Sequence, residues 1–397
     1  MQDDKDFYFD QVFKDYEKRE GFTIVPHKRN LGKGSFGLVK LIMYKNKNKN
    51  KKCAGKIVTK DNFDEIEYIK ELVGPHIIKS EKICQPINKY GKDYYLIIME
   101  RAQLQDLSKL NSFFHEKNLL KLIYPNCFDE KCSDTVLKFF ARQIIDGMMT
   151  LYQYNYVHFD IKPENILVLN NLILKITDFD LLKKIDDNTN EFKIPGGTQG
   201  YMTCEYHLDK RLNANEVRSQ DYFALGCTLF SLKYGFPLLK YQKEGDGEMQ
   251  AEEVFKILER RINYIKSHTF DKDFITFITN LLKYKPNERP KFEEIYRSKW
   301  LDSNSNDMNV INKIVEDYDQ NDEKLLLDLQ KQDYFNQKKQ IFEINDKQNT
   351  LNKKNKRYMR KCFKFKKRKE DIEIQISYNE NVDEKAKDKI WFLINSL

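Results

Sequence analysis

The chain has 397 residues, a length that predicts one large domain or two lobes with an appended segment, rather than one small core. Its apolar residues make up 40%, and 27 Phe with 23 Tyr are enough to build a substantial core. The net charge of +8 is local, because residues 353–369 hold eleven Lys or Arg and no acid, which leaves −3 for the rest of the chain.

The amino terminus is acidic and has no apolar signal core, and no apolar run approaches the ~18 residues of a membrane span. The seven cysteines are an odd number without a CxxC pair, and Cys127 and Cys132 have no zinc-type partners nearby. We therefore expect free thiols in an intracellular protein of the cytoplasm, with the nucleus as the alternative compartment, and no transmembrane segment.

The first predicted element is a short amphipathic helix over residues 7–16. Phe9, Val12, Phe13 and Tyr16 recur there at helical spacing. We favour packing of this helix on the domain surface over a docking motif for a partner.

A glycine-rich stretch follows, LGKGSFGLV, between segments that predict β-strands at 23–25 and 39–43. Glycines at this spacing allow backbone N–H groups to approach phosphate oxygens without obstruction by a Cβ. A plain hairpin turn is the simpler interpretation, and dinucleotide folds share the pattern but need a helix directly after it. Here a second strand, 53–58, follows and carries Lys56, which favours a hairpin that covers phosphates.

Residues 64–72 predict a helix on which Glu65 is either a surface charge or the partner of Lys56. An apolar strand at 94–99 leads through a connector at 100–102 into a helical region, and residues 112–132 are predicted to be an insertion. Long buried helices are predicted from 133 to 152 and from 221 to 230, and further helices near 251–267, 271–283 and 292–299. Strands followed by helices indicate an α+β fold with two lobes.

The densest group of ionisable residues lies between apolar runs in the middle of the chain. It reads HFDIKPEN over residues 158–165, and DFD follows at 178–180. A carboxylate, an ammonium group and two oxygen ligands for a metal are the groups that phosphoryl transfer needs, because its transition state depends on positioning and charge neutralisation.

These motifs, in this order, resemble the eukaryotic protein kinase superfamily of the serine/threonine type, over about residues 25–301. The match is carried by LGKGSFGLV, AGK, HFDIKPEN, DFD and GTQGYMTCE, and DYFALG and NERP agree with it. The resemblance implies a bilobal kinase fold with a β-rich N-lobe (25–100) and a helical C-lobe (103–301). Residues 1–24 form an N-terminal segment, and 302–397 a mostly helical C-terminal extension with the basic segment 353–369.

The resemblance also implies an ATP- and Mg²⁺-dependent enzyme with a role for each motif. The expected catalytic residues are Asp160, Lys162, Asn165, Lys56, Glu65 and Thr198, and the expected metal ligands are Asn165 and Asp178. The expected nucleotide contacts are Leu31, Gly32, Lys33, Gly34, Ser35, Phe36, Gly37, Leu38, Val39, Ala54, Lys56, Glu100, Ala102, Asp106 and Leu167.

Within this set, Asp160 would orient the substrate hydroxyl and accept its proton, and Lys162 would neutralise the transferred phosphoryl group. Thr198 would brace both residues. Met99 would lie behind the adenine. Glu205 and Arg289 would form a buried ion pair, and Asp221 would hold the catalytic loop or serve as a simple helix N-cap.

The chain departs from the family pattern in four places. Phe159 replaces an Arg that receives an activation-loop phosphate, so phosphorylation of Thr189 or its neighbours is not expected to be required. Asp180 replaces a Gly, which adds a negative charge near the metal and alters activity or metal affinity. Thr203-Cys204 replaces Ala-Pro and is expected to loosen the end of the activation segment. Gly55 is expected to weaken its strand.

The expected partner is a protein substrate, and Glu164 only slightly favours a basic one. The basic segment interleaves aromatic residues with its cations. It is a candidate for binding an anionic membrane surface or a partner protein, which we favour over nucleic acid, or it is a solvated arm. The alternative function is a weak pseudokinase or a nucleotide-binding scaffold with this basic tail.

Overall fold

The computed structural model describes residues 2–25, 30–33, 37–46, 49–59, 68–110, 130–169, 172–186, 188, 191–239, 251–269 and 271–302. The chain divides into two compact units, Met1–Leu326 and Leu327–Leu397, and every described residue belongs to the first. Glu65, Thr189, the predicted insertion at 112–132 up to residue 129, and the C-terminal extension beyond 302 lie outside the described residues.

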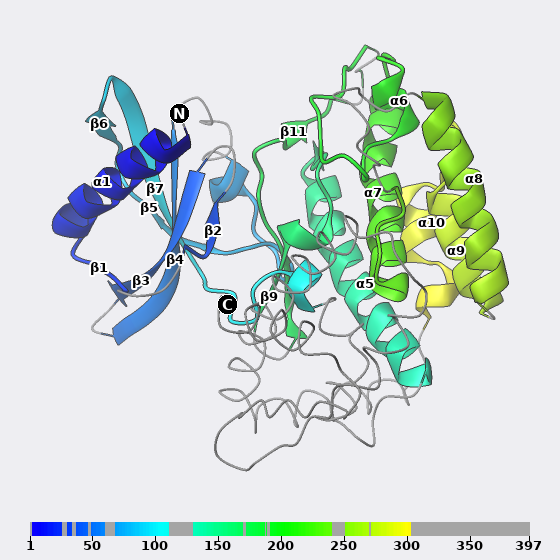
Figure 1. Ribbon diagram of the computed structural model, residues 1–397, viewed down its shortest axis with the longest axis horizontal. Coiled ribbons are helices and arrows are strands. Elements are labelled where there is room, and N and C mark those ends of the chain that lie inside the picture. Colours follow the sequence, from blue (N-terminus) through cyan, green and yellow to red (C-terminus); the bar gives the residue numbers. More distant parts are fainter. Residues whose placement is uncertain are drawn as a thin grey trace, which may run out of the picture. The chain divides into compact units, whose positions relative to one another are not determined.

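The N-terminal half is built on one antiparallel sheet with the strand order β1-β3-β4-β7-β5, to which β2 and β6 add at β3 and β7 (Figure 1). Its strands are β1 (Thr23–Ile24), β2 (Gly32–Lys33), β3 (Gly37–Asn46), β4 (Lys49–Thr59), β5 (Ser80–Ile83), β6 (Ile87–Lys89) and β7 (Lys92–Met99). The predicted strands at 39–43, 53–58 and 94–99 are therefore the three long central strands.

Successive side chains of each strand lie on opposite faces of this sheet. On β4, Cys53 and Ile57 belong to a hydrophobic cluster on one face, whereas Ala54 and Lys56 point to the other. The register pairs Gly55 with Ile98 of β7 and with Lys40 of β3, so the same alternation continues across the neighbouring strands.

Helix α1 (Gln2–Glu20) covers the clustered face of the sheet, as Figure 1 shows in dark blue. Val12, Phe13 and Tyr16 have no exposed surface and join Ile42, Leu96 and other strand residues in one cluster. The predicted helix is confirmed and is longer than residues 7–16, because the polar residues on either side of the apolar positions extend it.

The C-terminal half is helical. Its helices are α5 (Glu130–Gln153), α6 (Cys204–His207), α7 (Ala214–Tyr234), α8 (Ala251–His268), α9 (Lys272–Leu281) and α10 (Phe292–Tyr296), with short 3₁₀ turns η2 (Pro163–Asn165), η4 (Pro286–Glu288) and η5 (Lys299–Leu301). Two small antiparallel pairs join β8 (Tyr156–Val157) to β11 (Lys183–Lys184) and β9 (Ile166–Val168) to β10 (Leu174–Ile176). The predicted α+β arrangement of two lobes is confirmed.

Helix α7 is the centre of this half and is buried along nearly its whole length. Asn213 caps its first turn in a reciprocal capping box with Glu216, and Gly235 ends it in the left-handed conformation at φ 76°. The interpretation of Asp221 as an N-cap is therefore wrong, since this residue lies in the second turn. Among the described residues, no helix is long and apolar enough to cross a membrane.

Candidate active site

The backbone of the loop at 158–165 is held in place by one buried carboxylate. Asp221 accepts hydrogen bonds from the backbone N–H groups of His158 at 2.7 Å and Phe159 at 2.9 Å. Burial raises the pKa of Asp221 above its usual range, although these two donors and His158 act against the rise. The predicted hold of Asp221 on the loop is confirmed.

These contacts stabilise an unusual backbone conformation at Phe159, which has φ 63°. A left-handed conformation costs a bulky residue about 1–3 kcal/mol and persists only where its surroundings enforce it. On the other side of this residue, a Cβ on Gly197 would lie 2.9 Å from the carbonyl oxygen of Phe159, so the activation segment approaches the loop as glycine backbone.

The loop turns Asp160 into a shared acceptor. Its Oδ2 lies 2.6 Å from Lys162 Nζ and 2.8 Å from Asn165 Nδ2, and its Oδ1 accepts from the Thr198 N–H at 3.0 Å. Lys162 also donates to the Thr198 hydroxyl. Four of the predicted catalytic residues are thus in one hydrogen-bonded cluster, which fixes the carboxylate and places an ammonium group beside it.

A second cluster joins the sheet to the segment at 178–180. Lys56 Nζ lies 3.1 Å from Asp178 Oδ1 and 3.2 Å from Asp180 Oδ1. Burial acts to raise the pKa of Asp178, but the Lys56 ammonium, together with His158 and Lys162, holds this pKa below its usual range. The pairing of Lys56 with Asp180 was not predicted, because nothing in the sequence links these two positions.

The backbone of the DFD segment has its left-handed residue at the first position. Asp178 has φ 66°, whereas Asp180, which replaces the family's Gly, has no positive φ. Asp180 instead points its side chain, which is only 10% exposed, at Lys56.

The described part of the glycine-rich stretch forms the edge hairpin β2–β3. A Cβ on Gly37 would lie 2.4 Å from the carbonyl oxygen of Ile57, so only glycine fits there, whereas a Cβ on Gly32 would meet ordinary contacts. Val39 pairs with Lys56 and shares its face, but the side chain of Leu38 lies in the cluster under α1. Residues 34–36 lie outside the described residues; Leu31 is exposed, and Lys33 closes β2.

The predicted adenine-binding residues come from strands of both halves. Ala54 pairs with Met99, and Leu167 lies at the centre of β9, where it forms a bridge with Asp106. Asp106 accepts from Lys109 N and pairs with Lys109 Nζ at 3.2 Å, and so caps the helical turn at 107–110.

One backbone N–H group of the connector after β7 already donates a hydrogen bond within the protein. Glu100 donates its N–H to the Lys79 carbonyl at 3.0 Å, and its carboxylate pairs with Lys175 at 3.3 Å. Its carbonyl is therefore the part of Glu100 that fits the predicted hydrogen bond to a nucleotide, and the half-buried Ala102 follows two residues later.

The residues predicted to hold Mg²⁺ fit this ion. Asn165 uses its amide nitrogen on Asp160, which leaves the side-chain oxygen for a cation, and the Asp178 side chain is 41% exposed. Oxygen ligands suit Mg²⁺, which usually takes only one or two carboxylates from the protein and completes its shell with phosphate and water. Among the described residues, no group of three or more His, Cys, Asp or Glu is arranged to hold a metal ion by itself.

Phe159 is a member of a hydrophobic cluster that ties the loop to the activation segment. Its ring stacks on Phe192 with centroids 5.5 Å apart and 2° between the planes. The cluster also includes Ile185, Ile194 and Leu212, and Phe192 exchanges two backbone hydrogen bonds with Leu212. An apolar contact therefore occupies the position for which the family pattern has a cation.

The end of the activation segment is anchored in the helical half. Glu205 and Arg289 form the predicted ion pair at 3.0 Å, with side chains 3% and 0% exposed, and this prediction is confirmed. Thr203 bonds the Gln220 side chain, and Cys204 is buried at the start of α6. The expected loosening by Thr203-Cys204 is wrong for this structure, since both side chains are packed.

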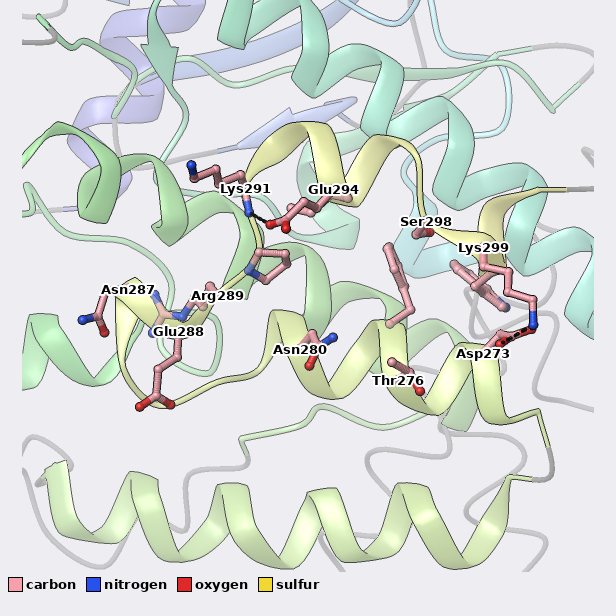
Figure 2. Close-up of a pocket in the computed structure, with 14 residues that line it drawn as sticks. Asp273, Thr276, Asn280, Asn287, Glu288, Arg289, Lys291, Glu294, Ser298 and Lys299 are labelled. Carbon is pink, nitrogen blue, oxygen red and sulfur yellow. Dashed lines mark hydrogen bonds and ion pairs between the residues drawn. The ribbon is translucent and has the colours of Figure 1, made fainter.

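A separate cavity of about 520 Å³ lies in the helical half between α9, η4, α10 and η5 (Figure 2). Lys299 pairs with Asp273 at one end of it, and the Lys291 N–H donates to Glu294 at the other. Its lining has as many cationic as anionic side chains and none of the predicted site residues. The cavity is thus distinct from the catalytic cluster.

Comparison with known proteins agrees with this geometry. Residues 26–301 match the family described as "Protein kinase domain". The chain is similar to serine/threonine-protein kinase cds1 of Schizosaccharomyces pombe, with 27% identity over 69% of this chain and 57% of that protein. It is also similar to calcium/calmodulin-dependent protein kinase cmkA of Emericella nidulans, with 26% identity over 73% and 64%.

A third relative is serine/threonine-protein kinase nekl-2 of Caenorhabditis elegans, with 27% identity over 67% of this chain and 71% of that protein. The chain spans less than two thirds of the first two relatives, so the similarity concerns the kinase region rather than their whole length. The match over residues 26–301, together with the catalytic cluster, places the chain in the protein kinase family.

Proposed function

We propose that this protein is an active serine/threonine protein kinase, which transfers the γ-phosphate of ATP to hydroxyl groups of proteins with the help of Mg²⁺. The observation that carries the proposal is the cluster of Asp160, Lys162 and Thr198 within hydrogen-bond reach of one another, next to the Lys56–Asp178 ion pair. These groups supply the positioning and the charge neutralisation that phosphoryl transfer requires.

Asp160 accepts the proton of the substrate hydroxyl and orients its oxygen toward the phosphate. Three donors hold its carboxylate, so it does not need to reorganise during the reaction. Lys162 stabilises the negative charge that develops on the transferred group, and the Thr198 hydroxyl keeps its ammonium group next to Asp160.

Asn165 and Asp178 would hold Mg²⁺, which would neutralise phosphate charge when bound. Lys56 binds phosphate oxygens from the sheet, and its approach to Asp178 places this cation close to the metal ligands. The glycine-rich hairpin covers the phosphates with backbone N–H groups, and Ala54, Leu167 and the connector at 100–102 contain the adenine.

Serine/threonine specificity rests on Lys162, two residues after Asp160, and on Thr198, and two of the relatives reported above carry the words serine/threonine-protein kinase in their names. For the substrate we propose a weak preference for basic sequences near Glu164. The Glu164 side chain is exposed beside the loop, where it can meet a substrate residue, but a single exposed carboxylate supports no strong preference.

The test is phosphate transfer from γ-labelled ATP to casein and histone, with an Asp160→Asn variant as the control. The Asn side chain would present either its amide nitrogen or an acceptor weaker than a carboxylate to Lys162 and Thr198. We therefore expect the rate of phosphate transfer to fall at least about 100-fold. Phosphoamino acid analysis should give phosphoserine and phosphothreonine. Equal incorporation by both proteins would refute the proposal and leave a nucleotide-binding scaffold with a basic tail.

The basic segment 353–369 provides a second, separate proposal, membrane or protein binding through its eleven cations. Pelleting of the full chain with vesicles of phosphatidylserine and phosphatidylcholine should decrease as salt increases. No binding to the anionic vesicles at low salt would remove the lipid proposal.

A further inference from the structure

Helix α1 lies outside the matched kinase region, which begins at residue 26, yet it is packed like part of the core. Phe13 and Tyr16 have no exposed surface. The Tyr16 hydroxyl donates to the Tyr94 carbonyl at 2.6 Å, and burial raises the pKa of Tyr16. Ion pairs also join α1 to the sheet, from Asp10 to Lys40 and from Glu20 to Lys82. Such packing suits a fixed element of the domain.

The contact of α1 with β4 is made at Gly55, the residue before Lys56. A Cβ on Gly55 would lie 3.4 Å from Phe13 Cε1 and 3.3 Å from the terminal methyl groups of Ile42 and Leu96. The ring of Phe13 thus occupies the space above the strand that a larger residue at 55 would fill. A glycine inside a strand often marks such a close approach.

Gly55 and Lys56 point to opposite faces of β4, because successive residues of a strand alternate. Phe13 therefore contacts β4 on the face opposite the Lys56 side chain, whose ammonium group lies close to Asp178 and Asp180. Across the sheet, Gly55 pairs with Lys40, whose ammonium lies 5.3 Å from the centre of the Phe13 ring. The same ring contacts both strands, so it fixes the distance of these strands from α1.

We propose that α1 is a positioning element of the nucleotide site, in which Phe13, packed against Gly55, fixes the strand that carries Lys56. The inference rests on the proposed role of Lys56 in binding phosphate. It extends that role to a helix that neither the kinase motifs nor the matched region includes. Phe13 and Gly55 are positioning residues, and they act through Lys56 without touching the nucleotide.

The first experiment measures the dissociation constant of Mg·ATP by calorimetry for the full chain, a readout that does not depend on phosphate transfer. Phe13→Ala leaves a cavity behind β4, and Gly55→Val crowds the same space. Each should weaken binding about fivefold. The double variant, in which the Val fills the cavity, should return to within about twofold of the original affinity.

A matched control removes an aromatic residue from α1 away from β4. Tyr8 is 39% exposed and contacts the Tyr90 ring, tilted by 56° with centroids 4.5 Å apart, so Tyr8→Ala should leave the affinity for Mg·ATP unchanged. If Phe13→Ala does not fold, two milder variants take its place. One is the single variant Gly55→Ala, and the other is the double variant that combines Phe13→Leu with Gly55→Ala. Gly55→Ala should weaken binding about threefold, and the added Phe13→Leu should restore it.

The second experiment repeats Gly55→Val and Gly55→Ala in a Lys56→Ala background. If α1 acts through Lys56, neither substitution should weaken binding further there. An equal loss in both backgrounds would overturn the inference, as would folded single variants that bind Mg·ATP as tightly as the original protein. A Lys56→Ala variant with unchanged affinity would instead refute the proposed role of Lys56, which separates the two failures.

Discussion

The rings of Phe159 and Phe192 stack in parallel, 5.5 Å apart, and join the catalytic loop to the activation segment. The family pattern at this position joins the same two segments through an Arg and a phosphate group. Here the junction is apolar. It is supported by the backbone pairing of Phe192 with Leu212, which holds the ring in place.

Activity is therefore expected to survive removal of phosphate from the protein. Treatment of the purified kinase with a protein phosphatase should leave its rate within about twofold, because the Phe159 ring has no means of binding a phosphate. The check is a phosphate-transfer assay before and after treatment, with mass spectrometry of the residues near Thr189. Activity that falls to background would show that a phosphate is required after all.

The stack itself can be removed at Phe192. Phe192→Ala should lower the rate of phosphate transfer about tenfold, since it deletes the partly buried ring that stacks on Phe159 and frees the segment that approaches Thr198. Phe192→Leu should retain most of the activity. As a control, Phe255, which is 40% exposed on α8, should tolerate the same change to Ala. Similar losses from both alanine substitutions would contradict a specific role for the stack.

If Lys56 binds phosphate as proposed, Asp180 should compete for it, because both its carboxylate and that of Asp178 lie within 3.2 Å of the ammonium group. Asp180→Gly, which introduces the family's residue, should lower KM for ATP about fivefold at saturating Mg²⁺, as expected for a partly buried ion pair of ~1 kcal/mol. Steady-state kinetics at several Mg²⁺ concentrations would measure this change. A higher KM would mean that Asp180 helps to hold Lys56 in its working position.

The Glu205–Arg289 pair predicts a large loss of stability. Arg289 also donates to the backbone of Lys283 and Tyr284, and its removal leaves Glu205 charged and buried. Arg289→Ala should reduce the free energy of unfolding by about 3–5 kcal/mol in urea denaturation. The exposed pair of Lys285 and Glu288, at 3.5 Å, gives the comparison, and Lys285→Ala should cost less than about 1 kcal/mol.

Cys84 gives a prediction for alkaline pH. Burial raises the pKa of its thiol from 9.0 to about 12, so the folded protein keeps the proton that the unfolded chain loses. The folded state then binds more protons, and the free energy of unfolding should fall as pH rises above 9. At pH 8, iodoacetamide should label Cys84 only after denaturation, as peptide mass spectrometry can test. Rapid labelling of the native protein would contradict the burial of this thiol.

The sequence was sufficient for features that depend on local motifs. The strands at 39–43 and 94–99, the long helices, the loop around Asp160 and the Glu205–Arg289 pair all follow from residue periodicity or from the family pattern. These features are visible because the chemistry requires particular residues at fixed spacing. The roles of the nucleotide-binding residues stay predictions, and those of Glu65 and residues 34–36 fall outside the described residues.

The remaining features depend on contacts between distant positions. Phe192 gives no sign that it will meet Phe159, and the Lys56–Asp180 pair joins residues 124 positions apart. Gly55 was interpreted as a weakness in its strand, whereas its lack of a side chain admits Phe13. A glycine in a strand interior together with an aromatic helix nearby was the available signal for that contact.

Asp221 has a consequence for the motions of the catalytic loop. Its buried carboxylate holds the amide protons of His158 and Phe159, and it is itself fixed in the central helix of the helical half. Those two amides should exchange with deuterated solvent only when that helix unfolds, and not through local loop openings. The base of the catalytic loop would then be among the slowest-exchanging parts of the protein, although it is not in a long helix or strand.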